Sequence, residues 1–310
     1  MSVDSLAAPA LPGVAAPGRT VAADREHRQR LLTREREIAG RHIGAPTWGY
    51  VALTLAGFAV WVVLFPLAMA GIIPLWLAFI VSAVLATAGY VPCHEAMHCN
   101  IARKGDRLYW LNELVGQVST IPLICSYSLA RLMHLEHHYH CNDPDRDPDY
   151  PDAAPNAWRA IVKTWFNRQP RNGGAMHHYK RILAELGTPE AKQAERDTVI
   201  LQLGAMAFFF AMAWSGYALV VALVWWLPRQ IALSYIRFYL SWAPHHPRDG
   251  LGRYANTRIF RSSLGHTLSL GMQYHLIHHL YPNIPIHRTK PAYHEMRDIL
   301  AARGVDTSPL

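Results

Sequence analysis

A long apolar segment of the sequence, from Ile43 to Cys93, reads IGAPTWGYVALTLAGFAVWVVLFPLAMAGIIPLWLAFIVSAVLATAGYVPC. It contains no Lys, Arg, Asp or Glu. As one helix it would measure roughly 75 Å, about twice the thickness of a bilayer core. A single span cannot accommodate that length. The stretch therefore predicts a hairpin of two membrane spans, about residues 48–70 and 75–92, which turns at Gly71–Pro74.

A second apolar block runs from Thr198 to Pro228 and thins out through Arg229 and Arg237. It fits two further spans, about residues 198–214 and 217–238, if the chain turns near Trp214–Gly216. Arg229 then has to face protein or reach toward the membrane surface. One long span is the alternative for this block.

The composition and the placement of charge agree with a membrane protein. Half of the residues are hydrophobic (51%) and only 17% are charged. Basic residues cluster before the first span, after the second, between residues 159 and 192, and after residue 248, so an even number of spans places them on one side. The positive-inside rule makes that side the cytoplasm. We therefore expect a multi-pass protein of the inner (cell) membrane with both termini cytoplasmic, and no nucleic-acid partner, despite the net charge of +8.

The beginning of the chain is Ala- and Pro-rich and lacks the apolar core of a secretory signal. Residues 1–40 are predicted to form a disordered, basic cytoplasmic tail. Residues 41–310 are predicted to form a single membrane-embedded domain.

The 18 histidines are not scattered. The sequence HEAMH starts where the second span should leave the membrane, and HLEHH and HLIHH repeat the spacing H-x-x-H-H. Positions i, i+3 and i+4 share one face of a helix, so the rings of each box can point at one object. The boxes contain His94 and His98, then His134, His137 and His138, and finally His275, His278 and His279.

Neutral imidazole is a common ligand for iron, zinc and copper. One zinc ion takes four ligands, and a haem takes at most two axial ligands, so eight or more imidazoles are too many for either. They suit two metal ions, and two irons held mainly by histidine suit oxygen activation at a membrane. A membrane metal-binding or transport protein is the non-enzymatic alternative. It would place histidines within the spans, whereas these stand at span ends.

Three stretches carry a resemblance to a known family: HLEHHYHCNDPDRDPDY (134–150), APHHP (243–247) and GMQYHLIHHLYPNIPIHRTKPAY (271–293). With HEAMH they resemble the membrane fatty acid desaturase and hydroxylase superfamily. They are most similar to the desaturase-related type of β-carotene hydroxylase. The resemblance implies an all-α integral membrane fold of about four transmembrane helices, with a helical cytoplasmic cap that carries a histidine-rich di-iron site.

The resemblance also implies which residues bind the irons. The eight box histidines are the expected ligands, and His245 of APHHP is the expected ninth, with His266 as its rival. No catalytic side chain beyond the ligands is expected. Extra ligands, or groups that hydrogen-bond to a ligating imidazole, are expected among His140, Asp143, Asp147 and His246.

The activity implied is O2-dependent hydroxylation of a carotenoid ring. β-Carotene would be hydroxylated at C3 to give cryptoxanthin and then zeaxanthin. No flavin or nicotinamide motif is visible, so electrons must come from an external donor of the ferredoxin and reductase type. The alternative is an acyl-lipid desaturase that uses the same di-iron centre, and either substrate would be lipophilic.

Overall fold

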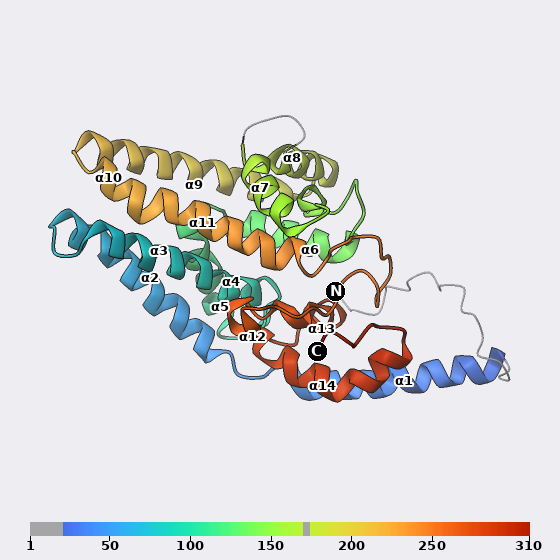
Figure 1. Ribbon diagram of the computed structural model, residues 1–310. Coiled ribbons are helices and arrows are strands. Elements are labelled where there is room, and N and C mark those ends of the chain that lie inside the picture. Colours follow the sequence, from blue (N-terminus) through green and yellow to red (C-terminus); the bar gives the residue numbers. More distant parts are fainter. Residues whose placement is uncertain (1–20, 170–173) are drawn as a thin grey trace.

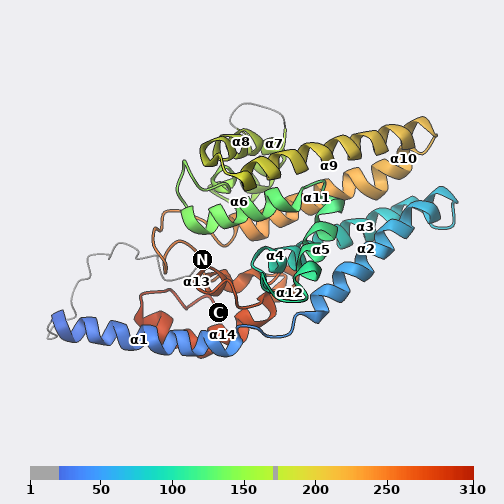
Figure 2. The same cartoon turned by 180° about the vertical axis from the view of Figure 1, so that it is seen from behind.

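The computed structural model describes residues 21–169 and 174–310, and all regular secondary structure in those ranges is helical. Long helices extend side by side toward one end of the molecule, and the remaining helices gather at the other end (Figure 1). The view from behind shows the same division (Figure 2). The all-α prediction is confirmed.

Four segments are long and apolar enough to cross a membrane: Trp48–Met69, Leu75–Met97, Pro189–Trp214 and Ala218–Trp242. The first is helix α2 (Trp48–Met69), and the third is α9 (Pro189–Trp214). The second contains α3 (Leu75–Ala88) and α4 (Tyr90–Met97). The fourth contains α10 (Ala218–Val221), the π-helical η4 (Ala222–Trp226), α11 (Leu227–Ile236) and the π-helical η5 (Arg237–Trp242). The prediction of about four transmembrane helices is therefore confirmed.

Several span boundaries differ from the predicted ones, since the fourth span also ends at Trp242 rather than near residue 238, and two of these differences have identifiable reasons. α9 starts at Pro189 rather than at Thr198, because the Thr188 side chain caps the helix by accepting a hydrogen bond from the N–H of Ala191. The second span continues past residue 92 through the first histidine box to Met97. The charge-free pattern marks where a helix is apolar, and these helices continue beyond that region.

The spans pack through aromatic side chains and a few buried hydrogen bonds. The indole N–H of Trp61 donates to Ser82 Oγ (3.0 Å), and Ser82 donates to the carbonyl of Val224 (2.5 Å). The Nε of Arg229, the residue that had to face protein, donates to the carbonyl of Leu123 (2.6 Å). A protein carbonyl therefore replaces water for this cation.

The remaining helices connect the spans and cover their ends. Between the second and third spans lie α5 (Tyr109–Thr120), η2 (Ile121–Leu123), α6 (Tyr127–His140), η3 (Tyr150–Asp152), α7 (Ala157–Asn167) and α8 (Ala175–Leu186). After the fourth span come α12 (Gly265–Leu268), η6 (Met272–Tyr274), α13 (His275–Leu280) and α14 (Ile286–Ala302).

The prediction of a disordered tail through residue 40 is wrong for its second half. Residues 21–42 form helix α1 (Val21–His42), which lies along α14 (Figure 1). Glu35 of α1 is fully buried and accepts hydrogen bonds from the hydroxyls of Tyr254 (2.9 Å) and Tyr281 (2.8 Å). These tertiary contacts stabilise a segment whose composition alone favours disorder. Residues 1–20 lie outside the described residues.

Candidate metal centre

The first histidine box lies at the end of the second span. His94 is in the last turn of α4, and His98 follows the final helical residue as its C-cap. Both side chains are buried. Glu95 between them is also buried and accepts hydrogen bonds from the N–H of Ile286 (3.0 Å) and from Asn100 Nδ2 (3.0 Å). This carboxylate therefore attaches the first box to the start of α14, directly after the third box.

The second and third boxes lie on α6 and α13. Ser126 caps the N-terminus of α6, accepting from the N–H of Leu129, and His134, His137 and His138 share one face of the last turns. The third box is α13 itself, which begins at His275. His245 lies just past η5, and its ring is buried.

The structure brings these segments together into two groups of four imidazoles. Within each group the ligand atoms all lie within 4.8 Å of one another. The first group contains His94, His98, His134 and His278, and the second contains His137, His245, His275 and His279. Each group therefore takes histidines from three separate parts of the chain.

His138 lies between the two groups. Its Nε2 atom is 3.0 Å from Nε2 of His278 and 3.1 Å from Nε2 of His134, both in the first group. Its ring stacks on His279 of the second group, with centroids 4.2 Å apart. All nine predicted ligands are thus gathered in one place.

The distances between these nitrogens fit metal coordination. Two nitrogens bound to one ion at about 2.1 Å and at right angles lie about 3.0 Å apart. The Nε2 atoms are separated by 2.7 Å for His98 and His134, 3.2 Å for His137 and His245, and 3.1 Å for His275 and His279. Both ring nitrogens of His94 are buried without a hydrogen-bond partner in the protein. A buried polar atom without a partner is costly, and a metal ion would satisfy it.

The electrostatics also suit metal binding. Burial, assisted by neighbouring imidazoles, lowers the pKa of His134 to about 3. It also lowers the pKa of six further rings outside the membrane spans well below the ordinary value. Those six are His98, His138, His245, His275, His278 and His279. Their rings are neutral at pH 7, which is the form that binds a metal ion.

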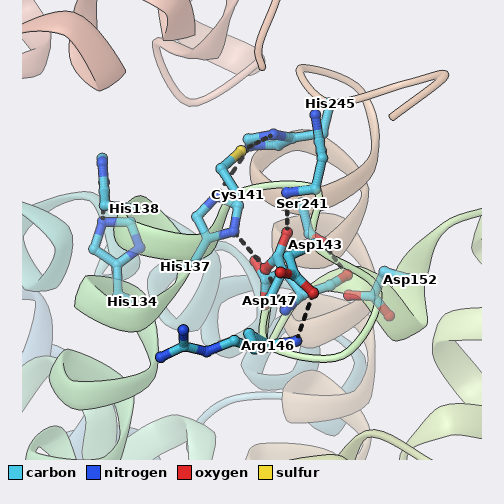
Figure 3. Close-up of polar contacts among 12 residues, drawn as sticks. His134, His137, His138, Cys141, Asp143, Arg146, Asp147, Asp152, Ser241 and His245 are labelled. Atoms are coloured by element: carbon cyan, nitrogen blue, oxygen red, sulfur yellow. Dashed lines mark hydrogen bonds and ion pairs between the residues drawn. The ribbon is translucent and has the colours of Figure 1, made fainter. Parts of the chain in front are cut away.

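His137 differs because a carboxylate faces it. Asp147 is fully buried, and its Oδ1 atom lies 2.7 Å from Nδ1 of His137. Burial lowers the pKa of His137, but the charge and the hydrogen bond of Asp147 outweigh it and raise that pKa. Asp147, which faces His137 in Figure 3, also accepts hydrogen bonds from the N–H groups of Asn142 and Asp149 and from Arg248. It therefore fixes the tautomer and orientation of one imidazole in the centre.

Asp143, which was also predicted to hydrogen-bond to a ligating imidazole, contacts the backbone of its own loop. Its carboxylate accepts hydrogen bonds from the N–H groups of Asp145 and Arg146, so it closes the turn after α6. A side chain so close in sequence can satisfy the local backbone instead of reaching the metal centre. The hydrogen bonds of Asp143 therefore go to the local backbone rather than to a ligating imidazole.

The three additional histidines stay outside the two groups. His140 faces Glu136 on its own helix (3.5 Å), and His246 stacks on the indole of Trp242. His266 packs on Tyr274. Of His245 and His266, the two candidates for the ninth ligand, only His245 lies in one of the two groups of imidazoles.

Two neighbours of the centre were not foreseen in the sequence. Cys141 Sγ lies 3.3 Å from Nδ1 of His245, and the spacing of Cys141 from His137, one helical turn, is the signal that could have found it. Arg248 pairs with Asp147 (3.2 Å) while both side chains are almost completely buried. No motif in the sequence singles out this arginine.

A largely apolar cavity reaches the centre between α6 and the fourth span. Its lining includes His134, with Leu123, Met133 and Leu240 among the apolar side chains. The side chain of Arg237 also lines the cavity.

The charged part of the cavity wall is internally paired. Arg237 donates to Asp149 (2.7 Å), to Asp152 (3.1 Å) and to the hydroxyl of Tyr179. Burial raises the pKa of Asp149, but the charge of Arg237 outweighs it and holds that pKa well below its ordinary value. Because these groups satisfy one another, the cavity suits an apolar guest.

Four candidate membrane spans and two groups of four imidazoles, each close enough together to hold one metal ion, are typical of a class of membrane oxidoreductases. The chain belongs to the fatty acid desaturase family, because residues 70–309 match the family described as Fatty acid desaturase. It is a member of the membrane desaturase and hydroxylase superfamily, whose di-iron chemistry the clustered histidines fit.

Named relatives include both desaturases and carotenoid ketolases. The chain is 26% identical over 211 residues to the sn-1 oleoyl-lipid 12-desaturase of Synechocystis sp., an alignment covering 64% of this chain and 54% of that protein. It is 27% identical over 214 residues to the dihydrorhizobitoxine desaturase of Bradyrhizobium elkanii (62% and 59%). It is 24% identical over 213 residues to the zeaxanthin 4-ketolase of Chlamydomonas reinhardtii (65% and 40%). The chain spans about half the length of the curated relatives it matches.

Proposed function

We propose that this protein is an O2-dependent di-iron hydroxylase of carotenoid rings, which converts β-carotene at C3 to cryptoxanthin and zeaxanthin. The observation that carries the proposal is the pair of four-imidazole groups at the end of an apolar cavity beside the membrane spans. The motifs around residues 134–150, 243–247 and 271–293, and the similarity to a zeaxanthin 4-ketolase, support a carotenoid substrate.

Two irons fit the residues present. His94, His98, His134 and His278 would hold one, and His137, His245, His275 and His279 the other, with His138 between them. When bound, this centre supplies reductive activation of dioxygen and oxidation of an unactivated C–H bond.

The chain's own residues prepare the site for that chemistry. Asp147 holds His137 in one orientation, and Glu95 holds the first box against the segment that follows the third. The apolar side chains of Leu123, Met133 and Leu240 accept the ring end of a polyene and exclude water from the space next to His134.

Electrons would come from a separate donor of the ferredoxin and reductase type. The basic segments favour a cytoplasmic position for the histidine boxes, so a soluble donor of the cytoplasm could reach them. The membrane would be the inner cell membrane, from which a lipophilic substrate enters.

Acyl-lipid desaturation is the second candidate, favoured by the similarity to the sn-1 oleoyl-lipid 12-desaturase. Expression in a bacterium that accumulates β-carotene tests both. Hydroxylated pigments, identified by chromatography and mass spectrometry and lost in His137→Ala and His278→Ala, support the hydroxylase. Unchanged pigment beside new double bonds in the membrane lipids supports the desaturase. If the iron-bound protein yields neither product, both candidate functions are contradicted.

A further inference from the structure

Helix α7 presents a stripe of large apolar side chains to its surroundings. Trp158, Ile161, Val162 and Trp165 are between 36% and 71% exposed. Their spacing of i, i+3, i+4 and i+7 places them on one face. The opposite face packs on η3 and η5, where Ala160 and Thr164 are buried. Contiguous apolar surface of this kind marks an interaction site.

The stripe forms one wall of a groove whose other wall is the fourth span. Ile161 and Trp165 face Leu227, Ile231, Tyr235 and Phe238. From residue 227 to residue 238 the helix rises about 17 Å, and half of a bilayer core is about 15 Å thick. The groove is therefore as long as one leaflet is deep, and it continues the lipid-facing surface of a membrane-spanning helix.

A cation without a salt-bridge partner lies beside this groove. Arg168 follows α7 and donates to Ser234 Oγ (3.0 Å) and to the carbonyl of Gln230 (3.5 Å), and both of those residues line the groove. Its Nε and Nη1 atoms are buried without a hydrogen-bond partner, and no carboxylate pairs with it in residues 21–169 and 174–310. The adjoining residues 170–173, Pro-Arg-Asn-Gly, contain no acidic residue.

The surroundings of Arg168 disfavour the charged form of its guanidinium group. Burial, with the nearby Arg237 and Arg229, lowers its pKa to about 10, so it remains a cation at pH 7. Asp152 acts in the opposite direction, but its carboxylate is already paired with Arg237. A partly buried cation that faces other cations is costly unless an anion reaches it. The structure thus combines a leaflet-long apolar groove with an unpaired positive charge at its side.

We propose that this groove binds one phospholipid from the leaflet on the side of the histidine boxes, with an acyl chain along the groove and the phosphate accepting from Nη2 of Arg168 in place of Ser234. The proposal does not depend on which substrate the metal centre oxidises. The bound lipid would also hold α7 in place, where Lys163 and Asn167 donate to the carbonyls of Ala153 and Pro151 in and directly after η3.

Lipid retention tests the proposal directly. The protein is purified from bacterial membranes in mild detergent, and phospholipid bound per chain is measured by native mass spectrometry. One phospholipid should remain on the wild type. Arg168→Gln and Ile231→Gln should each retain at least tenfold less. Arg196→Gln and Ile200→Gln on α9 are the matched controls, a cation and an exposed isoleucine outside the groove, and they should retain lipid as the wild type does.

A second measurement uses the wild-type groove. The fluorescence of Trp165, obtained as the difference between wild type and Trp165→Phe, is recorded in vesicles of phosphatidylglycerol with brominated acyl chains. It should be quenched strongly, and Arg168→Gln should reduce the quenching. Equal retention of lipid by groove and control variants, or no quenching of Trp165, would overturn the proposal.

Discussion

Replacing Asp147 with Asn changes one charge in the most constrained part of the centre. The two carboxylate oxygens accept four hydrogen bonds, from His137, Asn142, Asp149 and Arg248. The amide side chain of the variant would keep one accepting oxygen, and its NH2 group would face two donors. At least two hydrogen bonds to a charged group are therefore lost, each worth about 1.5–3 kcal/mol.

The loss should appear in stability and in metal binding. Breaking a buried ion pair while Arg248 stays buried costs about 3–5 kcal/mol. Loss of the partner that orients a metal-binding imidazole costs about 10- to 100-fold in metal affinity. We expect Asp147→Asn to lower the free energy of unfolding by about 3–5 kcal/mol and to weaken iron binding by that factor.

The matched control is Asp143→Asn, four residues earlier in the same loop. The side chain of Asp143 caps only exposed backbone N–H groups, and an Asn oxygen can still accept from them. Iron is titrated into metal-free protein, and thermal unfolding is recorded in detergent. If both variants lose iron equally, or if neither does, the role assigned to Asp147 from its contacts is refuted.

Three further outcomes follow from the structure. His245→Ala should lower the iron content of the purified protein from two toward one per chain, as measured by metal analysis. His266→Ala should leave the iron content unchanged, and the reverse result would exchange the roles of the two histidines. Gly116→Ala should destabilise the protein by about 1–3 kcal/mol, because a Cβ there would lie 2.4 Å from the ring of Tyr127. A Cβ at Gly204 on α9 would meet nothing within 4 Å, so Gly204→Ala should be neutral or stabilising, and thermal unfolding measures both variants. The metal-free protein should become less stable as pH falls below about 6.5, because the buried imidazoles of the centre whose pKa is lowered stay neutral when folded and take up protons only on unfolding. Each contributes up to about 1.4 kcal/mol per pH unit, and a flat stability profile in chemical denaturation would contradict this.

The sequence predicted the parts of the fold that depend on local composition. Charge-free runs mark the spans because a bilayer core excludes charge, and the spacing in the boxes fixes which imidazoles share a helix face. The division of the nine histidines into two groups depends instead on tertiary packing. His278 and His279 are neighbours in sequence, yet they belong to different groups.

The differences between the predictions and the structure also arise where tertiary packing decides the outcome. Asp143 and Asp147 lie in one acidic loop and look equivalent in sequence, but only the loop's fold decides which of them is buried against His137. Residues 21–40 have a polar composition typical of a tail, and tertiary contacts explain why they are ordered, among them the packing on α14 and the contacts of Glu35 with Tyr254 and Tyr281. His140, His246 and His266 were candidates by residue type, and their orientation keeps them out.

The distribution of the donors along the chain has a consequence for biogenesis. Each group needs rings that precede the third span and rings that follow the fourth. While the ribosome is still delivering the last span to the insertion machinery, the early imidazoles have no complete partner set. Neither group can therefore offer all four of its imidazoles to a metal ion until the whole bundle is inserted.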